Sequence, residues 1–191
     1  MTTERRQALA EAATDYVLEH GLLDLSLRPL AKALGTSDRM LLYHFRDKPD
    51  LVATVLRVSN DRSVSAIREM EPSAGPHTAV LELWSVVSAP EQARCQRLYV
   101  EAAALGVLGA EPYASVVGEA NQVWLEALAE QLAASGVPAG QAARAARLVE
   151  AAFMGLQLDE PVEPGVEIER SVHDLAEAVV ALWGSSTSSS P

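Results

Sequence analysis

The segment from residue 26 to residue 48 is SLRPLAKALGTSDRMLLYHFRDK. Ser26 and Ser37 are of a residue type that favours the position just before a helix, and Gly35 lies between the two short apolar patterns. A turn of three or four residues that contains glycine and joins two short helices is typical of a helix-turn-helix. We therefore predict one short helix on each side of residues 35–37.

The apolar residues of this segment are spaced to face one side, where they can pack on the helix predicted over residues 4–20: Leu30, Ala31, Leu34, Leu41 and Phe45. The second short helix then turns another set outward: Ser37, Asp38, Arg39, Met40, Tyr43 and His44. A plain helical bundle explains the apolar set equally well. It does not explain why the exposed positions carry partners for phosphates and bases, namely Arg28, Thr36, Ser37, Arg39, Tyr43, His44 and Lys48.

The charge distribution agrees with a DNA-binding N-terminal part. The net charge is −11 over 191 residues, but residues 1–62 carry as many basic as acidic side chains, so the excess acid lies after them. Within residues 28–48 the basic residues outnumber Asp38 and Asp47; they are Arg28, Lys32, Arg39, Arg46 and Lys48. A local positive face on an acidic body can dock on phosphate while the body suppresses non-specific binding.

The fold class predicted for the whole chain is all-α, with about nine helices, because Gly- and Pro-containing breaks separate Ala- and Leu-rich segments of helical periodicity. We expect Asp47 to cap a fourth helix that runs to about residue 70, and a kink at Ala89-Pro90. The predicted domains are a helix-turn-helix domain over residues 1–47, a helical ligand-binding and dimerisation domain over 48–184, and a disordered Ser-rich tail over 185–191.

Several function classes are disfavoured by the sequence. No apolar run is long enough to span a membrane, and the N-terminus has no apolar core of a signal peptide, so we expect a cytoplasmic protein. The single cysteine, Cys95, cannot form an internal disulfide, and we expect no metal or cofactor. Neither a phosphate-binding glycine loop nor a nucleophile elbow is present, so we do not expect an enzyme.

The N-terminal motifs resemble those of the TetR family of repressors. Ser26, Leu30-Ala31, Leu34-Gly35, Leu41, Tyr43-His44-Phe45 and Lys48 fall in step with that family's pattern, and the resemblance covers about residues 5–60. One position departs from it, because Leu42 stands where the family usually has a tyrosine whose hydroxyl contacts phosphate. Either Tyr43 and His44 supply more of that anchoring here, or Leu42 packs inward.

The resemblance implies a role for each residue of the segment. Arg28 would contact a guanine or a phosphate, while Arg39 and Met40 would contact base edges. Asp38 is expected mainly as a first-turn helix acid, with a cytosine contact as the lesser alternative. For His44 a phosphate contact is favoured over a place in the core. The remaining backbone contacts would come from Thr36, Ser37, Tyr43 and Lys48.

The C-terminal part carries large side chains within Ala- and Leu-rich helices, and core packing is the simplest explanation for most of them. A ligand pocket needs a few polar groups among apolar ones. The candidates for such a pocket are Trp84, Tyr99, Glu101, Trp124, Phe153 and Gln157. The acidic character of this part indicates a neutral or cationic ligand.

The last two predicted helices, over residues 141–157 and 167–183, carry apolar stripes rich in small residues. Packing within the chain explains such stripes, whereas the resemblance implies that these two helices pair with their copies in a homodimer. The function that follows is a ligand-responsive transcriptional regulator, most simply a repressor, that binds a palindromic operator in double-stranded DNA and leaves it when a small-molecule effector binds. A helical protein-interaction module without DNA binding is the alternative.

Overall fold

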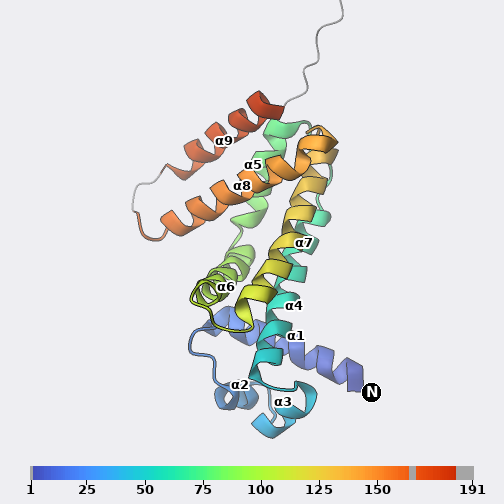
Figure 1. Ribbon diagram of the computed structural model, residues 1–191, viewed down its shortest axis with the longest axis vertical. Coiled ribbons are helices and arrows are strands. Elements are labelled where there is room, and N and C mark those ends of the chain that lie inside the picture. The colour runs from blue at the N-terminus through green and yellow to red at the C-terminus, as the bar shows by residue number, and fades with distance from the viewer. Residues whose placement is uncertain (1, 164–166, 184–191) are drawn as a thin grey trace, which may run out of the picture. The chain divides into compact units, whose positions relative to one another are not determined.

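The computed structural model describes residues 2–163 and 167–183, and this part of the chain consists of helices joined by turns (Figure 1). The predicted all-α class is confirmed. The predicted Ser-rich tail, residues 185–191, lies outside the described residues. Within the described ranges there are nine helices: α1 (Thr2–His20), α2 (Leu27–Ala33), α3 (Asp38–His44), α4 (Lys48–Arg68), α5 (Pro76–Val87), α6 (Pro90–Val107), α7 (Tyr113–Ala134), α8 (Ala139–Asp159) and α9 (Ile168–Trp183).

The chain divides into two compact units. The first, here called the N-terminal unit, contains Met1–Ser63 and Pro90–Gln122; the second, the C-terminal unit, contains Val64–Ala89 and Val123–Pro191. The N-terminal unit therefore includes α6 as well as α1, α2 and α3. Compactness does not tell which part binds which partner, so the functional boundary expected after residue 47 stays a prediction.

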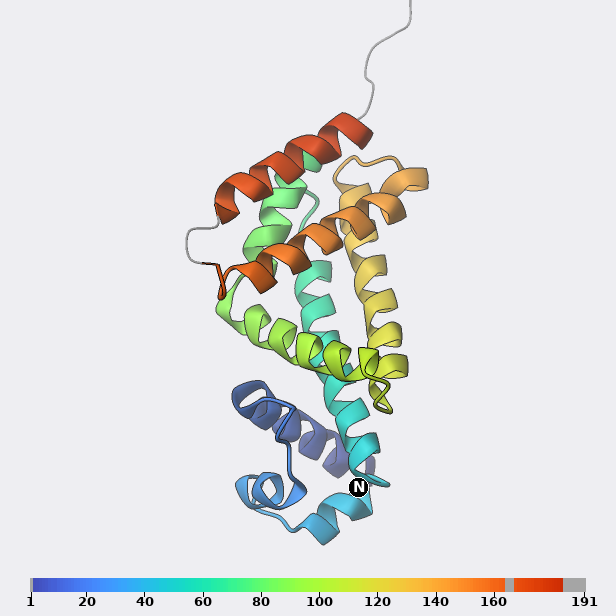
Figure 2. The same ribbon diagram turned by 60° about the vertical axis from the view of Figure 1, so that its left-hand side comes forward.

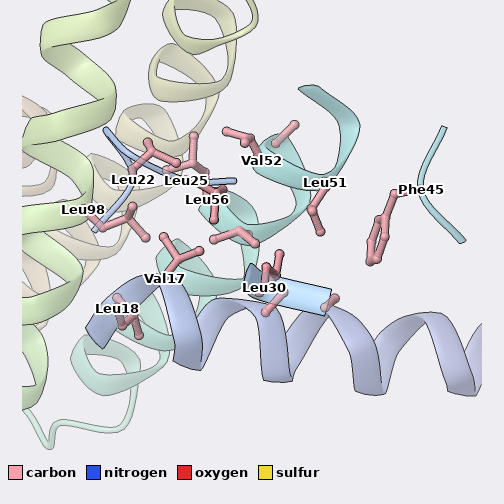
Figure 3. Packing of buried hydrophobic residues seen from close by; sticks show 14 of the residues in the cluster. Val17, Leu18, Leu22, Leu25, Leu30, Phe45, Leu51, Val52, Leu56 and Leu98 are labelled. Atoms are coloured by element: carbon pink, nitrogen blue, oxygen red, sulfur yellow. The ribbon is translucent and has the colours of Figure 1, made fainter. Parts of the chain in front are cut away.

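Helices α2 and α3 contain only seven residues each, too few for an isolated helix to be stable in water. They form because their apolar faces are buried in the core of the N-terminal unit. Leu30, Leu41 and Phe45 are fully buried, in one cluster with Val17 of α1 and residues of α4 (Figure 3). The predicted inward-facing residues are thus confirmed, with Leu34 partly buried at the edge of the cluster.

The turn between α2 and α3 depends on Gly35, whose φ of 64° lies in the left-handed region that only glycine adopts without strain. The Thr36 backbone N–H donates to the Ala31 carbonyl at 2.9 Å and closes the turn. Ser37 then caps α3 by accepting the Met40 N–H on its hydroxyl oxygen at 3.2 Å. Ser26 occupies the equivalent position before α2, but its side chain makes no capping hydrogen bond.

The start of α4 follows the predicted pattern closely. Asp47 accepts the Asp50 backbone N–H at 2.8 Å, and the Asp50 carboxylate in turn accepts the Arg46 N–H at 3.1 Å. The first bond satisfies a donor that the first turn of a helix leaves unpaired, and the second fixes the backbone just before the helix. Pro49 stands in that first turn, where its missing N–H costs nothing.

In the C-terminal unit the alanine-rich stripes of α8 and α9 are used inside the chain. Helix α9 packs on α5 and α8 (Figure 2). The residues of α8 that face inward are buried, and so are three from α9: Ala142, Ala145, Ala146, Val149 and Phe153, with Val172, Ala176 and Val179. Small side chains let the helices approach closely, so the packing explanation for these stripes is confirmed.

The chain breaks its helix completely at Ala89-Pro90, where a kink is expected, since α5 ends at Val87 and α6 begins at Pro90. A proline at the first position starts a new helix more easily than it continues an old one. None of the described helices is both long and apolar enough to cross a bilayer.

The buried anchors of α3 generate a stability prediction. We expect Phe45→Ala to lower the free energy of unfolding by about 3–5 kcal/mol, because it removes a fully buried ring. The control is Tyr43→Ala on the exposed face, with an expected change within about 0.5 kcal/mol. Urea unfolding followed by circular dichroism measures both. Equal losses for the two variants would contradict the anchoring role of Phe45.

Candidate DNA-binding site and effector region

The solvent-facing side of α3 carries the residues predicted to recognise DNA. Arg39, Met40 and Tyr43 are exposed, Tyr43 to 71% of its surface, while Leu41 between them is fully buried. The buried residue and the exposed ones thus lie on opposite sides of the same two helical turns. The arrangement presents a flexible cation, a thioether and a phenol from one short rigid helix.

A shallow groove brings the beginning of α2 together with the beginning of α3. It is lined by Arg28, Pro29, Ala31 and Lys32 on one side and by Thr36, Ser37 and Asp38 on the other. Four residues predicted from the sequence to bind DNA therefore share one concave surface. Lys32 adds an exposed cation to this groove that the predicted contact set did not include.

Two of the groove residues also stabilise the protein itself. The Ser37 hydroxyl is engaged in capping α3, and Asp38 is the acidic residue of its first turn. Thr36 is half-buried in the turn. The capping oxygen of Ser37 still leaves its O–H as a donor, which is the group a phosphate requires.

Lys48 has a structural partner that the sequence did not indicate. Its ammonium donates to the Leu25 carbonyl oxygen in the turn between α1 and α2. An ammonium has three donors, and the Lys48 side chain belongs to an exposed residue. Lys48 therefore joins the start of α4 to the start of α2 while keeping donor capacity on the surface.

The end of α3 resolves the question raised by Leu42, which is 42% exposed and so does not pack inward. Tyr43 and His44 lie edge to face, with ring centroids 5.2 Å apart. His44 is half-buried, which is intermediate between an exposed phosphate contact and a place in the core. Together these two aromatic side chains form the polar end of the exposed face.

Arg6 holds this end of α3 from α1, and sequence analysis missed it. Its guanidinium lies 5.0 Å from the centre of the Phe45 ring and donates to the His44 carbonyl at 3.2 Å. It also donates to the Thr54 hydroxyl at 3.2 Å and faces the Asp50 carboxylate at 3.6 Å. A cation on the last carbonyl of a helix is favourable for the helix dipole. No local motif signals the contact, because its partners lie at least 38 residues away along the chain.

Four of the six residues predicted for the effector region lie in the C-terminal unit. Trp84 and Phe153 meet edge to face with ring centroids 5.1 Å apart, and Gln157 donates to the Val87 carbonyl at 3.1 Å. The Trp124 indole N–H donates to the Glu150 carboxylate at 2.5 Å. The structure thus supplies aromatic surface and polar groups between α5, α7 and α8.

The other two, Tyr99 and Glu101, belong to the N-terminal unit. Tyr99 is half-buried on α6. The Glu101 carboxylate accepts the backbone N–H groups of Leu22 and Leu23, at 2.5 and 3.2 Å. Its oxygens are therefore engaged with the polypeptide itself.

Glu150 is a half-buried carboxyl that sequence analysis did not single out. Burial raises its pKa, and this effect outweighs the opposing influence of the Trp124 hydrogen bond and of the Arg147 charge. The shift marks a site where a negative charge is poorly solvated. Among the described residues no group of three or more metal-ligating side chains comes together, and Cys95 is buried.

Comparison with known proteins agrees with the geometry of the N-terminal unit. Residues 9–55 match the model of the family described as bacterial regulatory proteins, tetR family. This match contains α2, α3 and the first turns of α4, so the predicted resemblance is confirmed. No curated protein matches the sequence.

Solved structures share the fold over nearly the whole chain. A transcriptional regulator from Rhodococcus sp. Rha1 is 22% identical, with a TM-score of 0.76 over 94% of this chain and 98% of that one. A putative TetR-family regulator from Mesorhizobium loti MAFF303099 is 20% identical, with a TM-score of 0.69 over 97% and 99%. A putative regulator from Saccharomonospora viridis, solved in complex with choline, is 18% identical, with a TM-score of 0.68 over 93% and 96%.

Residues 9–55 therefore match a family of bacterial regulatory proteins, and nearly the whole chain shares the fold of solved transcriptional regulators. The description of that family as regulatory proteins agrees with the expectation that the chain is not an enzyme.

The raised pKa of Glu150 generates a pH prediction. A carboxyl whose pKa is higher in the folded than in the unfolded state costs stability when it is ionised, so its contribution improves as the pH falls through the folded pKa. We expect Glu150→Gln to be more stable than the wild type at neutral pH, with the advantage shrinking in acid. Thermal unfolding across a pH series measures this. Glu160→Gln, at an exposed position, is the control, and an advantage of Glu150→Gln that does not depend on pH would contradict the assignment.

Proposed function

We propose that this chain is a homodimeric repressor that binds a palindromic operator and dissociates when a small molecule binds in its C-terminal unit. The observation that carries the proposal is the exposed face of α3 in the segment that matches the family model. Arg39, Met40 and Tyr43 face the solvent there, while Leu41 and Phe45 fix the helix to the core. A protein that binds DNA is expected to act in the cytoplasm, where bacterial DNA is.

In this proposal α3 lies in the major groove and its exposed side chains contact base edges. Arg39 recognises guanine through two hydrogen bonds, and Met40 contacts a thymine methyl group. Arg28, at the rim of the groove between α2 and α3, contacts a guanine or a phosphate. Asp38 serves mainly α3 itself, with cytosine as its second possible partner. The phosphate contacts come from Thr36, Ser37, Tyr43, His44 and Lys48.

The dimer is proposed to form through the outward faces of α8 and α9. Their alanine-rich stripes are already buried within the chain, so an interface must use the other side of each helix. Leu148 on α8 and Val180 on α9 are 37% and 41% exposed, and Leu182 is also exposed. A twofold dimer would place its two α3 helices on half-sites about 34–36 Å apart, or a multiple of that distance.

The effector is proposed to bind near Trp84, Phe153 and Gln157, with Trp124 and Glu150 at the side. Aromatic surface with a few polar groups is the usual character of small-molecule sites. A poorly solvated carboxylate next to an indole favours a neutral or cationic ligand over an anion. The Saccharomonospora viridis protein of the same fold was solved with choline, a small cation.

DNA binding is tested with an operator selected from a random duplex library by the wild-type protein. We expect Arg39→Ala to cost about 1–3 kcal/mol on that operator and to relax the preference at one base pair. We expect Lys48→Ala to weaken binding to all sequences. The slope of log affinity against log salt concentration should become shallower by about one, the amount expected for one lost phosphate contact. Arg94→Ala, at an exposed position of α6, is the control. A wild-type protein that selects no sequence would favour a protein-interaction module instead.

The proposed interface is tested by sedimentation velocity. We expect the wild type to sediment as a dimer and Leu148→Glu or Val180→Glu to sediment as monomers, because each buries an unpaired charge in the interface. Val107→Glu is the matched control, since Val107 is also exposed but lies on α6. Dimers that survive both interface substitutions would place the contact elsewhere.

A further inference from the structure

Two charged residues one turn apart on α6 grip the end of α1. Arg97 donates to the Leu18 carbonyl at 3.0 Å, and Glu101 accepts the N–H groups of Leu22 and Leu23 at 2.5 and 3.2 Å. We call this pair the α6 clamp. Leu98, between the two, is buried in the same core cluster as Leu22 and lies near it in Figure 3. The clamp lies outside the segment that matches the family model, residues 9–55.

The chemistry of the clamp matches the polarity of the backbone it touches. A cation meets a carbonyl in the last turn of α1, where the helix dipole is negative. A carboxylate meets two donors just after Gly21, whose φ of 86° turns the chain out of the helix. The approach is close, because a Cβ on Gly21 would come within 3.2 Å of a Glu101 oxygen. Hydrogen bonds to a charged group are the stronger class, and the Glu101 side chain is only 17% exposed.

The residues held by the clamp lead directly to the DNA-binding surface. The Leu25 N–H donates to the Leu22 carbonyl at 3.1 Å, and the Leu25 carbonyl accepts the Lys48 ammonium. Helix α2 begins two residues later, without a side-chain cap from Ser26. Because α2 has no cap of its own, its start is held by the turn, and the turn is held by Glu101 and Lys48.

We propose that Arg97 and Glu101 are positioning residues for operator recognition. They touch no DNA and act through the turn between α1 and α2, which sets the place of Arg28 and of Lys48. This inference rests on the proposed function, because it concerns the DNA-binding surface. It assigns Glu101 to the support of that surface, and not to the effector pocket for which the sequence made it a candidate.

The experiment measures operator affinity for Glu101→Ala, Glu101→Gln and Arg97→Gln by fluorescence anisotropy on the selected operator and on an unrelated duplex. We expect Glu101→Ala to bind the operator about tenfold more weakly, as the loss of hydrogen bonds to a charged group predicts, with little change on the unrelated duplex. Glu101→Gln keeps one acceptor oxygen, so we expect its operator affinity to lie between those of the wild type and of Glu101→Ala. The control is Glu119→Gln, a carboxylate of the same unit whose partner is Arg57.

A double-mutant cycle separates positioning from a general loss of structure. If Glu101 acts on the start of α2, the double variant Glu101→Ala/Arg28→Ala loses operator affinity by a smaller factor than the product of the two single-variant factors. For the double variant Glu101→Ala/Arg39→Ala, with Arg39 on α3, we expect the loss to equal the product of the two factors. Amide hydrogen exchange at Leu22 and Leu23 should accelerate in Glu101→Ala and stay unchanged in Glu119→Gln.

Each outcome decides between distinct conclusions. A wild type that selects no operator overturns the proposed function and the clamp with it. A wild type that selects one, with Glu101 and Arg97 variants of undiminished affinity, overturns the clamp alone. Losses that multiply equally with Arg28→Ala and Arg39→Ala also overturn it, since they report the stability of the whole unit. If Glu101→Ala unfolds, the Glu101→Gln and Arg97→Gln arms carry the same comparison.

Discussion

The burial of Leu41 and Phe45 is the contact on which the DNA-binding surface depends. A helix of seven residues has almost no stability of its own, so α3 exists because these side chains fix it to the core. The same contact sets its rotation, and the rotation sends Arg39 and Tyr43 outward. Loss of either anchor would therefore affect both stability and DNA recognition, although neither side chain is exposed to a ligand.

Charged side chains from outside the helix-turn-helix complete what the apolar contacts begin. Arg6 bonds to the end of α3, Lys48 bonds to the turn before α2, and the α6 clamp bonds to the same turn. Each of these groups bonds to backbone atoms that the short helices and turns cannot satisfy by themselves. Because α2 and α3 have only seven residues each, we expect such contacts to have a large influence on where their exposed side chains lie.

The C-terminal unit uses its small residues for internal packing. Because the alanine stripe of α8 is buried within the chain, any surface for a second copy must consist of other residues, such as Leu148 and Val180. The same close packing leaves Glu150 poorly solvated beside Trp124, which raises its pKa. The excess acidic charge lies after residue 62, while residues 28–48 keep a local positive charge.

The sequence by itself determined the helical class, the helix boundaries around residues 26–48 and the exposed face of α3. These follow from local rules, since apolar periodicity, glycine turns and capping residues act over a few positions. Only the tertiary structure decided that Lys48 bonds to Leu25, that Arg6 closes α3 and that Glu101 bonds to the turn after α1. It also decided which face of α8 is buried. Those contacts join residues from 23 to 79 positions apart, and no local pattern specifies which distant backbone atom a charged side chain will reach.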